Sequence, residues 1–87
     1  MPKIEIYSTA VCPYCVAAKN LLQSKGLAWV EVRVDVDPQQ REAMLARSGG
    51  RRSVPQIFIN DQHVGGYDDL LAADRSGRLS QLLERVA

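Results

Sequence analysis

Two cysteines separated by a proline and a tyrosine, Cys12 and Cys15, are the side chains of this sequence best suited to covalent chemistry. Cys12 follows a strand-like segment and opens a helical one, so we expect it at the N-cap or one residue from it. There, unpaired backbone N–H groups and the positive end of the helix dipole stabilise a thiolate. We therefore expect the pKa of Cys12 to be depressed, which matters because the thiolate is the species that attacks a disulfide.

Cys15 lies nearly one helical turn after Cys12, so the two sulfurs are expected at the same edge of the helix, where they can bridge. Cys15 should be the more buried and more protonated thiol, which suits it to resolve a mixed disulfide on Cys12. Two alternatives stay open. The cysteines could be small buried hydrophobic residues, or half of a zinc site, although four ligands are usual and the chain adds only His63 to the two thiols. We expect no metal site within the chain.

The composition indicates one ordinary globular domain, residues 1–87, with 46% hydrophobic and 24% charged residues. Eleven basic and ten acidic side chains give a net charge of +1, so no strong field favours nucleic acid or an anionic membrane as a partner. The first residues lack the apolar run of a secretory signal, and no later run is long enough to span a bilayer. We expect a cytoplasmic protein.

The elements that position the cysteines follow from hydrophobic periodicity. Alternating patterns predict strands over residues 3–7 and 29–36, and helical spacing predicts a helix from about residue 13 to residue 25. A second helix is expected with Asp37 as N-cap and Pro38 at its first position, ending at Gly49-Gly50. Residues 56–59 and 63–65 predict a hairpin across residues 60–62. A last helical region begins at Tyr67, with an interruption at Ser76-Gly77.

This order predicts an α/β fold with one four-stranded mixed sheet, a parallel pair plus an antiparallel hairpin, flanked by three or more helices. Three segments in this order resemble glutaredoxin over nearly the whole chain: Cys-Pro-Tyr-Cys at residues 12–15, Ser-Val-Pro-Gln-Ile-Phe-Ile at residues 53–59, and Gly-Gly-Tyr-Asp-Asp at residues 65–69. The resemblance implies a thioredoxin-like fold and reduction of protein disulfides and of glutathione mixed disulfides, with Cys12 as nucleophile and Cys15 as resolving thiol.

The resemblance also implies the partners: glutathione as reducing co-substrate, and disulfide-containing or glutathionylated proteins as substrates, with no tightly bound cofactor and a monomeric chain. Pro55 would follow a cis peptide bond. The Val54 backbone would then lie beside Cys12 and pair with glutathione as a short extra strand. Ser53 belongs to the same segment, and Tyr14 would flank the bound sulfur.

At the other end of the ligand, the resemblance implies that Gly65-Gly66 let the backbone approach closely and that the N–H groups of Tyr67 and Asp68 hold the γ-glutamyl carboxylate. Asp68 or Asp69 would bind its ammonium group. Arg41 corresponds to a family position that reaches the glycine carboxylate, a task that suits a guanidinium.

Structural roles compete with these assignments. Asp68 and Asp69 could only complement the helix dipole, and Arg41 could be a solvated surface charge. Arg51-Arg52 could steer the anionic tripeptide, but exposed loop arginines are common. His63 is expected to be structural and Trp29 to pack in the core.

The sequence departs from the family pattern at three places. Thr9 stands where many relatives carry a lysine, Ser53 replaces the usual threonine, and Gly49-Gly50 lengthens the preceding loop by one residue. These changes bear on glutathione affinity, for which Arg41 or Arg51 could compensate, more than on the type of reaction.

Two other functions are weighed. One is a homodimer with a [2Fe-2S] cluster held by Cys12 of each chain and two glutathione thiolates, against which Pro13 argues because similar cluster-binding proteins usually lack it. The other is a redoxin reduced by a flavoprotein reductase instead of glutathione.

Overall fold

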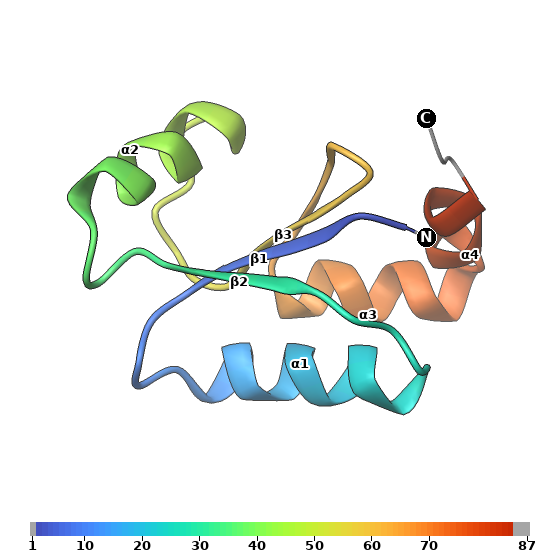
Figure 1. The fold of residues 1–87 in the computed structure, drawn as a ribbon. Helices are drawn as coiled ribbons and strands as arrows, with labels where there is room; N and C mark the ends of the chain where they lie inside the picture. The colour runs from blue at the N-terminus through green and yellow to red at the C-terminus, as the bar shows by residue number, and fades with distance from the viewer. Residues whose placement is uncertain (1, 85–87) are drawn as a thin grey trace.

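Four strands form one sheet in the computed structural model, which describes residues 2–84 (Figure 1). Residue 1 and residues 85–87 of the expected domain lie outside the described residues. The elements are β1 (Ile4–Ser8), α1 (Pro13–Ser24), β2 (Val30–Arg33), α2 (Pro38–Arg47), β3 (Gln56–Ile59), β4 (Gln62–Gly65), α3 (Tyr67–Ser76) and α4 (Arg78–Glu84). The strand order is β2-β1-β3-β4, with β1 parallel to β2 and antiparallel to β3, and β3 antiparallel to β4. The predicted mixed sheet is confirmed.

Successive side chains of a strand point to opposite sides, so the sheet has apolar side chains on both faces, and helices cover both. Helices α1 and α3 lie against one face and α2 against the other (Figure 1). On the first side, Ile6 and Ile57 belong to the larger apolar cluster together with α1 and α3 residues such as Leu22 and Leu70. On the second side, a smaller cluster consists of Tyr7, Val34, Met44 and Phe58. Complete burial of one aliphatic side chain such as Leu22 contributes about 2 kcal/mol to stability.

The helix termini follow the local signals of the sequence. Cys12 is the N-cap of α1, and Asp37 is the N-cap of α2, where its carboxylate accepts a hydrogen bond from Gln39 N at 3.0 Å. Gly77 has φ +85°, a left-handed conformation that favours glycine, and it separates α3 from α4. The predicted caps and the predicted interruption at Ser76-Gly77 are confirmed.

Strand β2 is shorter than the predicted strand of residues 29–36, which is therefore wrong at both ends. The chain turns away from the sheet after Arg33, whose guanidinium binds the Asp35 carboxylate at 2.6 Å. Val34 still packs in the smaller cluster, but Val30 and Val36 are exposed. The strand that β2 pairs with, β1, ends at Ser8, the partner of Arg33, so the ladder does not continue beyond this pair.

The hairpin and the other predicted boundaries differ by one or two residues. Its turn consists of Asn60 and Asp61, both with positive φ, as a type I′ turn requires, and Gln62 already belongs to β4. Strand β1 runs one residue later than predicted, and α1 ends at Ser24, not at Lys25.

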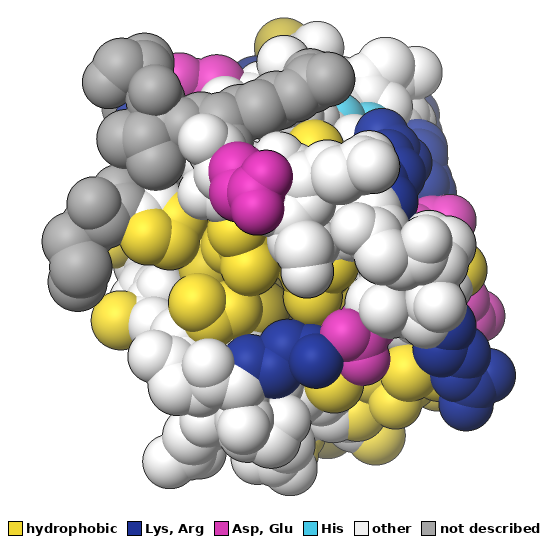
Figure 2. All heavy atoms as spheres, turned by 90° about the vertical axis from the view of Figure 1, so that its right-hand side faces the viewer, with side chains coloured by type: hydrophobic (Ala, Val, Ile, Leu, Met, Phe, Trp, Pro, Cys, Tyr) yellow, Lys and Arg dark blue, Asp and Glu magenta, His cyan; other side chains and the backbone are white. Residues whose placement is uncertain are grey.

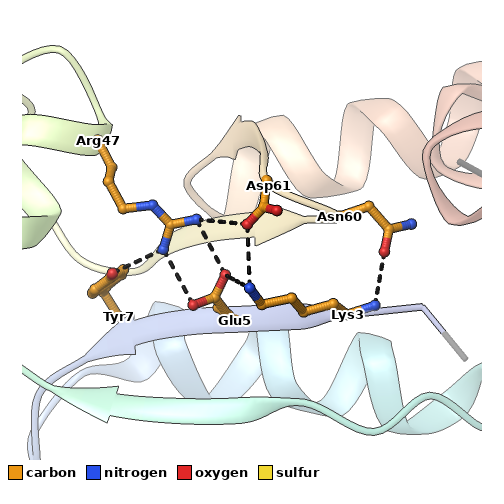
Figure 3. Close-up of polar contacts among 6 residues, drawn as sticks. All are labelled: Lys3, Glu5, Tyr7, Arg47, Asn60 and Asp61. Carbon is orange, nitrogen blue, oxygen red and sulfur yellow. Dashed lines mark hydrogen bonds and ion pairs between the residues drawn. The ribbon is translucent and has the colours of Figure 1, made fainter. Parts of the chain in front are cut away.

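A polar network joins the end of α2 to the sheet (Figure 3). The Arg47 guanidinium contacts both Glu5 carboxylate oxygens at 3.2 and 3.1 Å and the Tyr7 hydroxyl at 2.9 Å. It also lies over the Phe58 ring, 4.0 Å from its centroid. Asp61 in the hairpin turn contacts Arg47 at 3.5 Å and Lys3 at 3.3 Å. Through Arg47, α2 is thus bound to β1 and to the hairpin.

The face that carries α4 and the ends of α1 and α3 shows a gathering of hydrophobic side chains bordered by charged ones (Figure 2). At the C-terminal end of α1, Leu27 and Trp29 are partly buried against the larger cluster. This packing role of Trp29 is the one expected from the sequence. None of the helices within residues 2–84 combines the length and apolarity needed to cross a membrane.

Candidate active site

Cys12 and Cys15 meet at the N-terminus of α1, where they form a disulfide with a Cα–Cα distance of 5.2 Å. The backbone N–H of Cys15 points at Cys12 Sγ across 3.1 Å. Cys15 is 1% exposed and Cys12 8% exposed, so only the first sulfur is close to the surface. This geometry lets Cys12 contact a substrate, while Cys15 is buried but within bonding distance of Cys12.

The loop before Cys12 is held by contacts to β2 and to the turn that follows β2. Ala10 N donates to the Asp35 carboxylate at 3.0 Å. Ser8 is fully buried, and its hydroxyl donates to Glu31 at 2.6 Å; Lys19 of α1 binds the same carboxylate at 3.1 Å. The hydrogen bond from Ser8 is the main reason why the pKa of Glu31 is lowered. Ser8 at the start of the loop and Ala10 within it are therefore held, and Lys19 ties α1 to the same carboxylate as Ser8.

The segment opposite Cys12 carries the cis peptide bond between Val54 and Pro55 that the resemblance implied. The carbonyl oxygen of Val54 lies 3.7 Å from Cys12 Sγ. The backbone at residue 54 thus borders the Cys12 sulfur directly.

A cleft of about 360 Å³ begins beside these residues. Tyr14 of α1 and Tyr67 of α3 stand on its two sides, with ring centroids 6.4 Å apart. The lining residues are Tyr14, Arg51, Ser53, Val54, Pro55, Gly66, Tyr67, Asp68 and Asp69. The structure therefore brings together every glutathione-site residue expected from the sequence except Arg41. That residue is exposed on α2 and is not part of the lining.

The far end of the cleft is the N-terminus of α3. The first intrahelical bond runs from Leu70 N to Gly66 O at 3.0 Å, so the N–H groups of Tyr67, Asp68 and Asp69 have no partner within the helix. Free N–H groups at a helix start favour an anion. This end of the cleft can therefore bind a carboxylate.

Asp69 is already engaged within the protein. Its Oδ2 accepts a hydrogen bond from Gly66 N at 2.9 Å and lies 3.2 Å from Arg51 Nη1. The bond from Gly66, followed by that from Arg51, lowers the pKa of Asp69. Asp68 in the same turn is exposed and faces the cleft. Of the two carboxylates, Asp68 is the one better placed to meet a cationic group.

Gly65 makes this arrangement possible. It has φ +121°, and a Cβ on this residue would collide with the Asp69 carboxylate and lie 2.9 Å from Arg51 Nη1. The resemblance points to the glycine pair, whereas the sequence indicates for Arg51 only a loop arginine that could steer the ligand, and not a lining residue. Its position after Gly49-Gly50 and just before residues 53–55 was the available signal.

No cluster of three or more potential metal-ligating side chains occurs within residues 2–84. The two thiols are joined to each other, and His63 Nε2 lies 2.7 Å from Gln56 Oε1.

Comparison with known proteins agrees with this geometry. A family model described as Glutaredoxin matches residues 4–64. The glutaredoxin of Pseudomonas aeruginosa is 53% identical over 95% of this chain and 98% of its own length. The solution structure of the Brucella melitensis glutaredoxin superposes with a TM-score of 0.80 at 45% identity, covering 94% of this chain and 88% of that one. A buckwheat glutaredoxin, solved as a complex with glutathione, gives 0.82 at 29% identity, covering 92% and 74%. The thioredoxin-like fold is confirmed.

Proposed function

Because this chain belongs to the glutaredoxin family of glutathione-dependent thiol-disulfide oxidoreductases, we propose that Cys12 is its nucleophile and Cys15 its resolving thiol. The observation that carries this assignment is the N-cap position of Cys12, whose sulfur accepts the N–H of Cys15 at 3.1 Å. A hydrogen bond and a helix N-terminus both favour the anionic sulfur. Cys15 is buried behind it and lacks that position.

With a glutathionylated protein, the Cys12 thiolate attacks the glutathione sulfur. The substrate S–S bond breaks, a new S–S bond joins Cys12 to glutathione, and the protein thiolate leaves and takes a proton. A second glutathione thiolate then attacks the glutathione sulfur on Cys12. Glutathione disulfide leaves, and the Cys12 thiolate is restored.

With a protein disulfide, the Cys12 thiolate attacks one substrate sulfur and the other leaves as a thiol. Cys15, after losing its proton, attacks Cys12 Sγ, releases the second substrate thiol and forms the Cys12–Cys15 disulfide seen here. Two glutathione molecules reduce this disulfide and leave as glutathione disulfide. The structure thus corresponds to the oxidised state of the dithiol route.

We assign each part of glutathione to a part of the cleft by backbone pairing and by charge. The backbone at Val54 pairs with the cysteinyl residue of glutathione, next to Cys12. The free N–H groups of Tyr67 and Asp68 hold the γ-glutamyl carboxylate, and the Asp68 carboxylate binds the ammonium group. Arg51 adds a positive charge at this same end. Arg41 stays the predicted partner of the glycine carboxylate.

The cysteine variants test the proposal. Cys12→Ser should abolish turnover of a glutathionylated peptide by glutathione, since no nucleophile is left. Cys15→Ser should retain much of this activity and lose the reduction of protein disulfides that needs both thiols. A Cys12→Ser protein as active as the parent would refute the assignment, and an inactive Cys15→Ser protein with glutathionylated substrate would refute the division of roles.

We further propose that residues 1–87 act as one domain, as a monomer of the cytoplasm and without a tightly bound cofactor. Small size, a net charge of +1 and the cysteine usage support this proposal. Light scattering on anaerobically purified protein with glutathione present should give the monomer mass and a colourless sample. A coloured dimer would contradict it.

A further inference from the structure

Gln56 is a polar side chain buried without any exposed surface, at the start of β3 and next to the cleft segment. Its Nε2 donates to the backbone carbonyl of Ser53 at 3.0 Å and to the Ser53 hydroxyl at 3.2 Å. Its Oε1 lies 2.7 Å from His63 Nε2. A buried amide is stable only when its polar atoms have partners, and here Nε2 has two and Oε1 has one.

These contacts determine the orientation of the amide and the protonation of the ring. A backbone carbonyl can only accept, so the Gln56 atom that faces Ser53 O must be the nitrogen. The oxygen therefore faces His63, whose Nε2 must carry a hydrogen. The direction of donation is thus fixed from His63 through Gln56 to Ser53.

The position of the His63 ring is fixed in turn by the sheet. His63 is paired with Phe58 across β4 and β3, and the two rings stack with centroids 4.9 Å apart. A register irregularity follows at once: Ile57 pairs with Gly65, so Val64 is the extra residue on β4. His63 lies on the same face of the sheet as Phe58, with which it pairs, and as Gln56, which stands two residues before Phe58 in β3.

We infer that His63 and Gln56 are positioning residues that hold the backbone of Ser53 and Val54 against Cys12 and thereby set the affinity for glutathione. The inference rests on the proposed function, in which the Val54 backbone binds the tripeptide. Upstream of Ser53, the chain is a loop whose residue 51 is bound to Ser48. Between this contact and β3, the two bonds from Gln56 anchor residue 53 from within the core. Neither positioning residue belongs to the cleft lining, so each acts through the segment that it holds.

The test compares KM and kcat for glutathione in four variants. Gln56→Met keeps the approximate size but breaks the hydrogen bonds, and His63→Leu removes the donor. We expect KM to rise roughly five- to thirtyfold in Gln56→Met, the factor that one or two lost hydrogen bonds produce, with kcat changed less than about threefold. His63→Gln, which retains an N–H donor, should restore KM toward the parent value. Gln62→Met is the control, since Gln62 is an exposed neighbour of His63 on β4.

Two further readouts separate positioning from a merely structural role. The rate of Cys12 alkylation by iodoacetamide in the reduced protein should not change, because the nucleophile is untouched. The double variant Gln56→Met/His63→Leu should be no worse than Gln56→Met alone, since both residues act through one chain of bonds. If Gln56→Met does not fold, the comparison of KM for glutathione between His63→Leu and His63→Gln tests the inference instead.

The outcomes are distinct. Parent-like KM in both Gln56→Met and His63→Leu would overturn the inference while leaving the proposed function intact. Equal losses in His63→Leu and His63→Gln, or additive losses in the double variant, would also overturn it. A parent protein whose turnover did not depend on Cys12 would instead refute the proposed function.

Discussion

The Arg51 guanidinium lies 3.2 Å from the Asp69 carboxylate, so an ion pair between a loop and the start of α3 forms one wall of the cleft beside the reactive disulfide. The Arg51 side chain is 45% exposed and that of Asp69 is 48% exposed, and ion pairs as exposed as this contribute little to stability. The significance of Arg51 is therefore its charge at a site for an anionic ligand. Such a charge increases the rate of encounter and is weakened by salt.

Replacing Arg51 with methionine is expected to raise KM for glutathione about fivefold at low salt, the effect of roughly 1 kcal/mol. The melting temperature should remain within a few degrees of the parent value. Steady-state kinetics at two salt concentrations measure this effect. Arg52→Met is the matched control, because Arg52 is exposed next to Arg51 but outside the cleft lining. Equal effects of the two variants would show that only general charge matters.

Asp68 and Asp69 should respond differently to alanine. Asp69→Ala removes the carboxylate that accepts the Gly66 N–H, and we expect it to lower the free energy of unfolding by about 1 kcal/mol. Asp68→Ala should leave stability almost unchanged and raise KM for glutathione several-fold, because the ammonium group loses its partner. Urea unfolding combined with kinetics separates the two effects. A KM unchanged in Asp68→Ala would remove this residue from the site.

The single histidine makes the pH dependence of stability directly measurable. Burial, followed by Arg51, lowers the pKa of His63 below 6.5; Arg47 acts in the same direction, and Asp69 opposes them. Since the unfolded chain binds this proton more tightly, His63 makes the protein less stable as the pH falls through 6.5 toward the folded-state pKa. Above pH 6.5 this loss is absent.

An NMR titration of the His63 ring should therefore show a midpoint below 6.5. Urea unfolding at pH 7.5 and pH 5 should show a smaller loss of stability on acidification in His63→Gln than in the parent. A midpoint above 6.5 would contradict the predicted direction.

Arg47 should be the most sensitive residue of the network in Figure 3. Arg47→Met is expected to lower the free energy of unfolding by about 2 kcal/mol, because Glu5, with 17% side-chain exposure, loses its partner and the Phe58 ring loses a stacked cation. Arg47→Lys should recover little, since an ammonium group cannot contact both Glu5 oxygens and Tyr7 from one plane. Thermal unfolding measures both variants.

Lys3→Met provides the control for Arg47. Its ammonium group contacts the same Glu5 and Asp61, but it is 60% exposed, so its loss should cost less than about 0.5 kcal/mol. A stability loss in Lys3→Met as large as in Arg47→Met would show that net charge, and not the planar stacked guanidinium, holds α2 to the sheet.

The sequence alone sufficed for features that depend on neighbours along the chain. Cys12 as N-cap, Cys15 one turn inside the helix, Asp37 as cap of α2 and the break at Gly77 all follow from local hydrogen-bonding needs. The order of strands and helices followed from periodicity, and the resemblance of three segments to a family supplied the cis bond at Pro55 and most of the cleft.

The tertiary structure alone decided which distant side chains meet, because such contacts depend on sheet register, twist and helix placement, which no local pattern encodes. It ended β2 at Arg33, whose partner Ser8 is the last residue of β1, although the valine alternation continues to Val36. It placed Arg51 and not Arg41 in the cleft lining. It joined His63 to Ser53 through the buried amide of Gln56, a contact that exists because the pairing of β4 with β3 places His63 on the face that Gln56 shares with Phe58.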